Sequence, residues 1–146
     1  MTEPQSDTTP LIRWFDQVGR HDTKTVGGKG GNLGELARAG LPVPAGFLVT
    51  SDAFLVTLAA NGVRDELLQQ FVATQRDEPA ALDTRAKQMR ELTHTLVFPT
   101  QLQAAIAAAY DRLGGDARVA VRSSATSEDS ATTSFAGMHE SFTNVR

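Results

Sequence analysis

The chain has 146 residues, a formal net charge of −3 and a hydrophobic content of 40%. This length suits one domain with a hydrophobic core, or two small lobes, and the charge includes no basic excess for a nucleic-acid backbone. We therefore expect no nucleic-acid partner. Because the chain lacks cysteine, disulfides, thiolate catalysis, thiolate metal sites and redox chemistry are excluded.

The amino-terminal segment is polar. Residues 1–10 lack both the basic start and the apolar stretch of a secretion signal, so we interpret them as a disordered tail. No apolar run approaches the roughly 18–20 residues needed to cross a bilayer. We therefore expect a cytoplasmic chain without membrane contact. Residues 11–15 are apolar and aromatic, which predicts an opening strand, and residues 19–22 predict a turn.

A glycine-rich segment follows. Residues 26–34 read Val-Gly-Gly-Lys-Gly-Gly-Asn-Leu-Gly, with Lys29 near the centre. Apolar residues then recur at helical spacing until glycine and proline stop the pattern at residues 40–42. We expect a loop followed by a helix that begins near Asn32, whose amino-terminal dipole would favour an anion.

The middle of the chain predicts one strand and four helices. Residues 42–46 are too rich in proline for a helix, while residues 47–49 suit a buried strand before Thr50 or Ser51 caps a helix. Asparagine and glycine at residues 61–62 end that helix. Further helical patterns cover residues 63–72, 82–96 and 99–113, the last with an apolar stripe at Leu102, Ile106, Ala109 and Leu113.

The carboxyl-terminal segment is the second informative one. Alternation at residues 119–122 predicts a short strand from which Arg122 emerges. Residues 122–129 read Arg-Ser-Ser-Ala-Thr-Ser-Glu-Asp, and residues 134–137 read Ser-Phe-Ala-Gly. Phe135 and Phe142 are interpreted as packing residues on either side of a glycine hinge, with a hairpin as one arrangement.

Lys29 and Arg122 are the candidate phosphate ligands. A polyphosphate requires cations and accessible backbone N–H groups, and glycine leaves the latter uncovered. The lysine segment is neither a Walker A motif nor a dinucleotide fingerprint, because its glycine spacing fits neither. Each motif alone also has a plainer interpretation: a turn with a solvated lysine, and an arginine paired with Glu128 or Asp129.

Other polar residues carry weaker signals. We expect His21 and His94 to be solvated or to pack, while His139 is a candidate for touching phosphate. The hydroxyls of Ser123, Ser124 and Thr126 are interpreted as turn and cap donors rather than nucleophiles, since no base partner is evident.

Taken together, the order and spacing of these motifs resemble the amino-terminal ATP-binding domain of the phosphoenolpyruvate synthase family, which includes pyruvate phosphate dikinase and rifampicin phosphotransferase. The resemblance runs from residues 14–19 through the lysine segment and residues 42–47 to residues 144–145. It implies the first lobe of an ATP-grasp domain, an α+β (α/β) fold with a small mixed sheet and several helices. Residues 11–146 would be the amino-terminal part of that domain, without the second lobe, the phosphohistidine domain or the pyruvate domain.

Carried over residue by residue, the resemblance implies that Lys29 and Arg122 contact the phosphates of ATP and stabilise their charge, with Gly28 and Gly30 in the cradle. Met138 stands where relatives usually carry glutamine, which removes a polar contact but leaves the backbone donors. Ligands for Mg²⁺ are expected outside this chain. The covering loop would consist of Ser134, Phe135, Ala136, Gly137, Met138 and His139.

By the same resemblance, the full enzyme would convert ATP, pyruvate and water into phosphoenolpyruvate, AMP and phosphate, and this chain would be inactive alone. Pyruvate phosphate dikinase and rifampicin phosphotransferase are the alternative parent activities. A different alternative is a free-standing remnant or partner-binding module without catalysis. The expected partners are a nucleotide and either the missing lobe or another chain.

Overall fold

The computed structural model describes residues 10–74, 79–125 and 140–146. The chain divides into two compact units. The strand unit comprises residues 1–53 and 102–146, and the helical unit comprises residues 54–101. Lys29 and Arg122, the two candidate phosphate ligands, therefore belong to the same unit.

The strand unit opens with a pair of short strands. Strand β1 (Ile12–Trp14) pairs antiparallel with β2 (Phe47–Val49), which confirms both predicted strands. Trp14 lies opposite Phe47 in this pairing, and their ring centroids are 5.7 Å apart. Two 3-10 helices, η1 (Phe15–Gln17) and η2 (Arg20–Asp22), connect β1 to the first α-helix.

Helix α1 (Thr23–Arg38) contains the whole glycine-rich segment, so the prediction of a loop followed by a helix from Asn32 was wrong. Only Gly27 leaves the helical conformation, with φ 74° and ψ 168°. Gly30 and Gly31 are closely packed: a Cβ atom on Gly30 would stand 3.0 Å from Leu48 Cδ2, and one on Gly31 would stand 2.9 Å from the carbonyl oxygen of Gly19. Burial of this glycine face against its neighbours outweighs the low intrinsic helix propensity of glycine.

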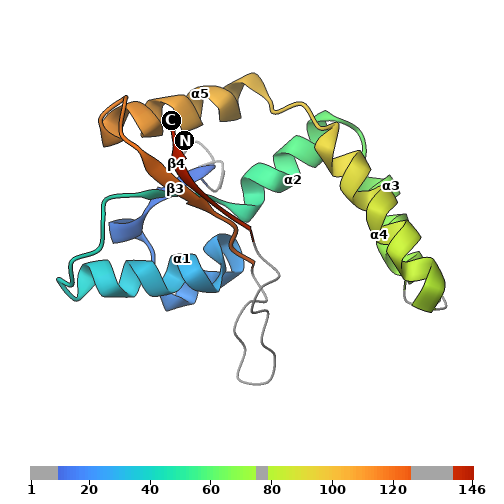
Figure 1. The fold of residues 1–146 in the computed structure, drawn as a ribbon, viewed down its shortest axis with the longest axis horizontal. Coiled ribbons are helices and arrows are strands. Elements are labelled where there is room, and N and C mark those ends of the chain that lie inside the picture. Colours follow the sequence, from blue (N-terminus) through green and yellow to red (C-terminus); the bar gives the residue numbers. More distant parts are fainter. Residues whose placement is uncertain (1–9, 75–78, 126–139) are drawn as a thin grey trace, which may run out of the picture. The chain divides into compact units, whose positions relative to one another are not determined.

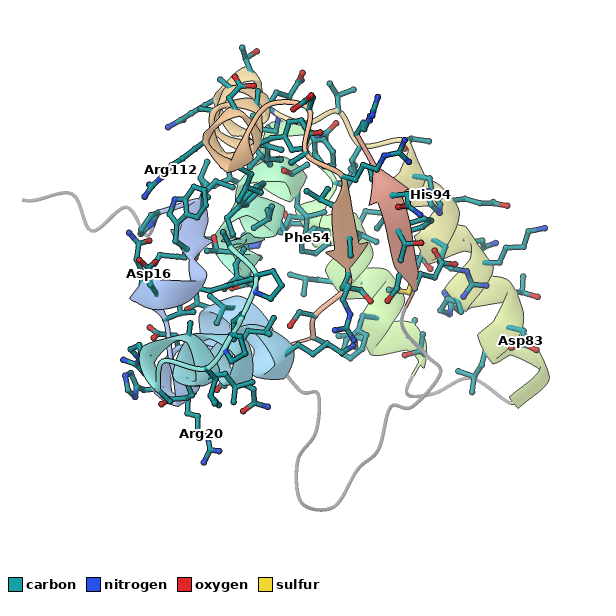
Figure 2. All side chains as sticks on the ribbon, turned by 60° about the vertical axis from the view of Figure 1, so that its left-hand side comes forward. Asp16, Arg20, Phe54, Asp83, His94 and Arg112 are labelled. Carbon is teal, nitrogen blue, oxygen red and sulfur yellow. The ribbon has the colours of Figure 1, made fainter. Side chains whose placement is uncertain are left out.

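Helix α5 (Thr100–Leu113) returns the chain to the strand unit and confirms its predicted apolar stripe. Leu102 and Ala109 are 2% and 6% exposed, and Gly114 and Gly115 follow the helix with positive φ. In Figure 1, α1 and α5 lie on opposite sides of the strands of this unit. Figure 2 shows Arg112 reaching from α5 toward β1, where its guanidinium carbon lies 4.2 Å from the centre of the Trp14 ring.

A second strand pair ends the chain. Strand β3 (Val119–Arg122) pairs antiparallel with β4 (Ser141–Val145), with an irregularity between Val119 and Val121. The predicted strand that ends at Arg122 is confirmed, and Phe142 pairs with Val121 in the ribbon. Phe142 is 56% exposed on the ribbon.

The helical unit contains the remaining helices. Helix α2 (Ser51–Ala60) begins in the strand unit and continues into the helical unit, followed by α3 (Arg64–Thr74) and α4 (Pro79–His94). These confirm the predicted helices. Helices α3 and α4 lie side by side (Figure 1), and Arg85 Nη1 donates to Gln70 Oε1 across them at 2.8 Å. Gly62, with φ 68°, ends α2 as expected.

The fold class is α+β, as predicted. The described residues form five α-helices and two antiparallel strand pairs, where one small mixed sheet had been expected. Across residues 10–74, 79–125 and 140–146, none of the helices is both long and apolar enough to cross a lipid bilayer.

Candidate functional site

The two sequence motifs meet in the strand unit. Lys29 Nζ donates a hydrogen bond to the backbone oxygen of Ser123 at 3.3 Å, across 94 residues of sequence. Ser123 directly follows Arg122, the last residue of β3. The structure thus brings the lysine of α1 to the segment that carries the candidate arginine.

The break in α1 provides the attachment point. A helix end leaves backbone N–H and C=O groups without partners inside the helix, and Gly27 creates such an end within α1. The segment after β3 bonds to both sides of it: Ser124 Oγ donates to the oxygen of Val26 at 3.1 Å, and the N–H of Gly28 donates to the oxygen of Ala125 at 3.3 Å. With the Lys29 contact, these bonds define the α1–β3 junction, made of residues 26–29 and 123–125.

Glycine is required at position 27 for two reasons. Its φ of 74° lies in the left-handed region, which disfavours residues with a Cβ atom. A Cβ atom there would also stand 2.1 Å from Ser124 Oγ and 2.9 Å from the oxygen of Ala125. The junction closes only because this side chain is missing.

Arg122 is held by the β-ribbon. It lies opposite Ser141 in β4, and its side chain is exposed. The next residue, Ser123, donates from both its backbone N–H and its Oγ to the oxygen of Glu140, each at 3.3 Å. The backbone on either side of Arg122 is therefore tied to β4. Glu128 and Asp129, the partners considered for this arginine, lie outside the described residues.

The remaining predicted site residues fall into two groups. Gly28 is half-buried and its N–H is bonded to Ala125, while Gly30 is buried against Leu48. Their place in a phosphate cradle stays a prediction. Outside the described residues lie Ser134, Phe135, Ala136, Gly137, Met138 and His139.

No signal in the sequence indicated the bond from Ser124 to Val26. Ser124 was interpreted as a local turn or cap donor, but the acceptor of its hydroxyl lies 98 residues away. Hydroxyl donors of this kind satisfy helix ends in many folds, so the residue type was understood correctly while its partner was not.

Within the described ranges, no group of three or more histidine, aspartate or glutamate residues could hold a metal ion. Lys29 and Arg122 are cationic donors, the kind of group that binds an anion.

Comparison with known proteins places these observations in a family. Residues 23–146 match the family described as the pyruvate phosphate dikinase, AMP/ATP-binding domain. The chain is 37% identical over 147 residues to a probable phosphoenolpyruvate synthase of Methanocaldococcus jannaschii, covering 97% of this chain and 12% of that protein.

Two bacterial relatives agree. The chain is 39% identical over 146 residues to the phosphoenolpyruvate synthase of Escherichia coli, covering 95% of this chain and 18% of that protein. It is 40% identical over 152 residues to the Synechocystis phosphoenolpyruvate synthase, with coverage of 94% and 18%. This chain thus spans 12% to 18% of the length of these relatives. The match confirms the resemblance seen in the motifs, and the chain belongs to the pyruvate phosphate dikinase AMP/ATP-binding domain family.

Proposed function

We propose that this chain is the ATP-binding amino-terminal portion of a phosphoenolpyruvate synthase-like phosphotransferase, in which Lys29 and Arg122 face the phosphates of ATP. The single observation that supports this assignment most directly is the hydrogen bond from Lys29 Nζ to the oxygen of Ser123 at 3.3 Å, next to Arg122. The lysine of α1 thus contacts the residue that directly follows Arg122, although the two lie far apart in the sequence.

The two cations have different chemistry. The guanidinium of Arg122 is planar and donates in a bidentate manner to phosphate oxygens, whereas the ammonium of Lys29 is a compact charge on a flexible stem. Lys29 Nζ donates a hydrogen bond to the neutral carbonyl oxygen of Ser123. An ionised phosphate oxygen is a stronger acceptor than such a carbonyl oxygen. Both residues act electrostatically, by stabilising negative charge on the transferring group.

The rest of the proposed machinery lies beyond these two residues. Residues 134–139 would cover the nucleotide, and Mg²⁺, held by ligands from outside this chain, would offset part of the negative charge of the phosphates. The complete enzyme would convert ATP, pyruvate and water into phosphoenolpyruvate, AMP and phosphate in the cytoplasm, and this chain alone would be inactive. The relatives are named phosphoenolpyruvate synthases, which favours this activity over those of pyruvate phosphate dikinase and rifampicin phosphotransferase.

Calorimetric titration of the 146-residue chain with ATP and Mg²⁺ tests the proposal. Removing a charge-assisted hydrogen bond costs about 1.5–3 kcal/mol, so we expect Lys29→Ala and Arg122→Ala each to weaken binding by roughly tenfold or more. Lys24→Ala, on the same helix, and Arg118→Ala, just before β3, are matched controls with exposed side chains and should bind like the parent.

Equal loss in the control variants would indicate general charge attraction and contradict the assignment. No binding by the folded parent chain would instead favour the second candidate, a partner-binding module. The cross-strand pair Val121 and Phe142 supports that candidate, because these residues are 50% and 56% exposed on the ribbon. Recovery of Mg²⁺-dependent ATP turnover after the second lobe is added in trans would decide for the phosphotransferase.

A further inference from the structure

Ser124 connects the two motifs of the α1–β3 junction through its side chain, and it is not itself a candidate phosphate ligand. Its Oγ donates to the oxygen of Val26 at 3.1 Å. The neighbouring bond, from Gly28 to Ala125, is between backbone groups. The remaining bond uses Lys29 itself. The hydroxyl of Ser124 can therefore be removed without removing either cationic side chain.

We infer that Ser124 is a positioning residue for polyphosphate, whose hydroxyl ties the segment after Arg122 to the break in α1 and so holds Lys29 and Arg122 in one arrangement. The inference rests on the proposed function, because it concerns how the two cations are presented to the same ligand. It adds a residue that contacts neither the nucleotide nor the metal and acts only through the two cations.

The geometry around the hydroxyl supports this role. Val26 is 4% exposed, so in the folded chain its carbonyl oxygen has little contact with water and Ser124 Oγ is the donor that reaches it. The acceptor is free for Ser124 because Gly27 interrupts the helix there. The Ser124 oxygen also occupies the space that a side chain at residue 27 would need, 2.1 Å from the position of a Cβ atom. The hydroxyl of Ser124 can reach Val26 only because residue 27 has no side chain.

The energetic argument is one of preorganisation. A site whose ligands are already fixed loses less conformational freedom when the ligand binds. Without the hydroxyl, residues 123–125 keep the bonds from Gly28 to Ala125 and from Lys29 to Ser123 but lose the bond that Ser124 donates to α1. When Lys29 turns from Ser123 to a phosphate oxygen, the segment after Arg122 is then held to α1 by one bond fewer. The nucleotide has to fix more of the arrangement, which lowers affinity without removing either charge.

Titration with ATP and Mg²⁺ of Ser124→Ala and Ser124→Thr in the 146-residue chain tests the inference. We expect Ser124→Ala to weaken binding about three- to tenfold and Ser124→Thr, which keeps the hydroxyl, to restore binding to within about twofold of the parent. Ser51→Ala is the matched control, because Ser51 Oγ also donates to a carbonyl of α1, that of Lys24 at 3.4 Å, but does not join the motifs. It should bind like the parent.

A double variant separates positioning from direct contact with phosphate. If Ser124 acts through the cations, its removal should cost much less in a Lys29→Ala background than in the parent. An equal cost in both backgrounds would overturn the inference in favour of a direct contact. If Ser124→Ala does not fold, Ser124→Cys, which keeps the size and weakens the donor, carries the same expectations.

The outcomes also separate this inference from the function on which it rests. Binding by the parent chain together with unchanged binding by Ser124→Ala would overturn only the role of Ser124. Failure of Ser124→Thr to restore binding would do the same. Absence of ATP binding by the folded parent chain would overturn the proposed function and this inference together.

Discussion

Gly34 of α1 lies so close to Val18 that a Cβ atom on it would stand 2.2 Å from the carbonyl oxygen of Val18. Val18 is fully buried, and its backbone cannot retreat without moving the segment that leads into η2. The glycine is therefore a packing residue: it allows α1 to approach the preceding chain at backbone distance.

Gly34→Ala should consequently destabilise the fold, although alanine is the better helix former. Overpacking of this kind costs about 1–3 kcal/mol, against a gain of about 1 kcal/mol in helix propensity. Urea denaturation measures the balance. Asn32→Ala, at an exposed position of the same helix, should be neutral or slightly stabilising. A gain in stability for Gly34→Ala would refute the close contact.

Gly27→Ala tests the break in α1. The change places a Cβ atom at a φ of 74° and against Ser124 Oγ, so strain and collision add. Gly62→Ala is the matched control, because its φ is 68° but nothing lies within 4 Å of the added atom. We expect the control to lose about 1–2 kcal/mol and Gly27→Ala to lose clearly more in chemical denaturation. Equal losses of unfolding free energy in the two variants would mean that the contact between residue 27 and Ser124 adds nothing to stability.

Glu35 should make the stability of the chain depend on acid. Its Oε1 accepts a hydrogen bond from the backbone N–H of Arg20 at 3.0 Å and one from Arg38 Nη2 at 2.6 Å. The bond from Arg20, followed by the charge of Arg38, holds the pKa of Glu35 below its usual value of 4.5. A carboxyl with a lowered folded-state pKa stabilises the fold above its unfolded-state pKa, and this contribution is lost as the pH falls through the folded-state value.

Glu35→Gln should therefore be less stable than the parent at pH 7, and the difference should shrink as the pH falls below 4.5. Urea denaturation at a series of pH values measures it. Glu91→Gln is the comparison, because Glu91 forms an exposed ion pair with Lys87, with 3.8 Å between Nζ and Oε1. Exposed pairs of this spacing on a helix contribute about 0.3–0.5 kcal/mol. A difference in unfolding free energy between Glu35→Gln and the parent that does not change with pH would contradict the lowered pKa of Glu35.

Arg112 should control the environment of Trp14. Its guanidinium carbon lies 4.2 Å from the ring centre, a cation–π geometry worth about 0.5–1 kcal/mol at exposed sites. Because Trp14 is the single tryptophan of the chain, its fluorescence reports directly on this contact. We expect Arg112→Ala to uncover the ring, shift its emission to longer wavelength and lower stability slightly.

Arg90→Ala, on α4 of the helical unit, removes an exposed arginine elsewhere and should leave the emission unchanged. Arg112→Lys should retain part of the effect, since an ammonium is a weaker stacking partner than a guanidinium. Identical spectra for the parent and Arg112→Ala would show that α5 does not cover the ring in solution.

Local structure was predictable wherever it depends on near neighbours in the sequence. The apolar stripe of α5 and the alternation of β3 follow from periodicity, and Gly62 ends α2 because it adopts a positive φ without strain. The same reasoning failed for residues 28–31, because a run of glycines has low helix propensity in isolation. In the folded chain those glycines are helical, since Gly30 and Gly31 are buried against neighbours that the local sequence does not include.

By itself, the sequence determined the family and the fold class, because these depend on motifs and their order, and it supplied the proposal that Lys29 and Arg122 bind phosphate. Only the tertiary structure decided that Lys29 reaches Ser123 and that Ser124 anchors on Val26, across 94 and 98 residues. The physical reason is that a hydrogen-bond partner is selected by which unsatisfied backbone groups meet in space. A break at Gly27 and a strand end at Arg122 meet only after the chain has folded.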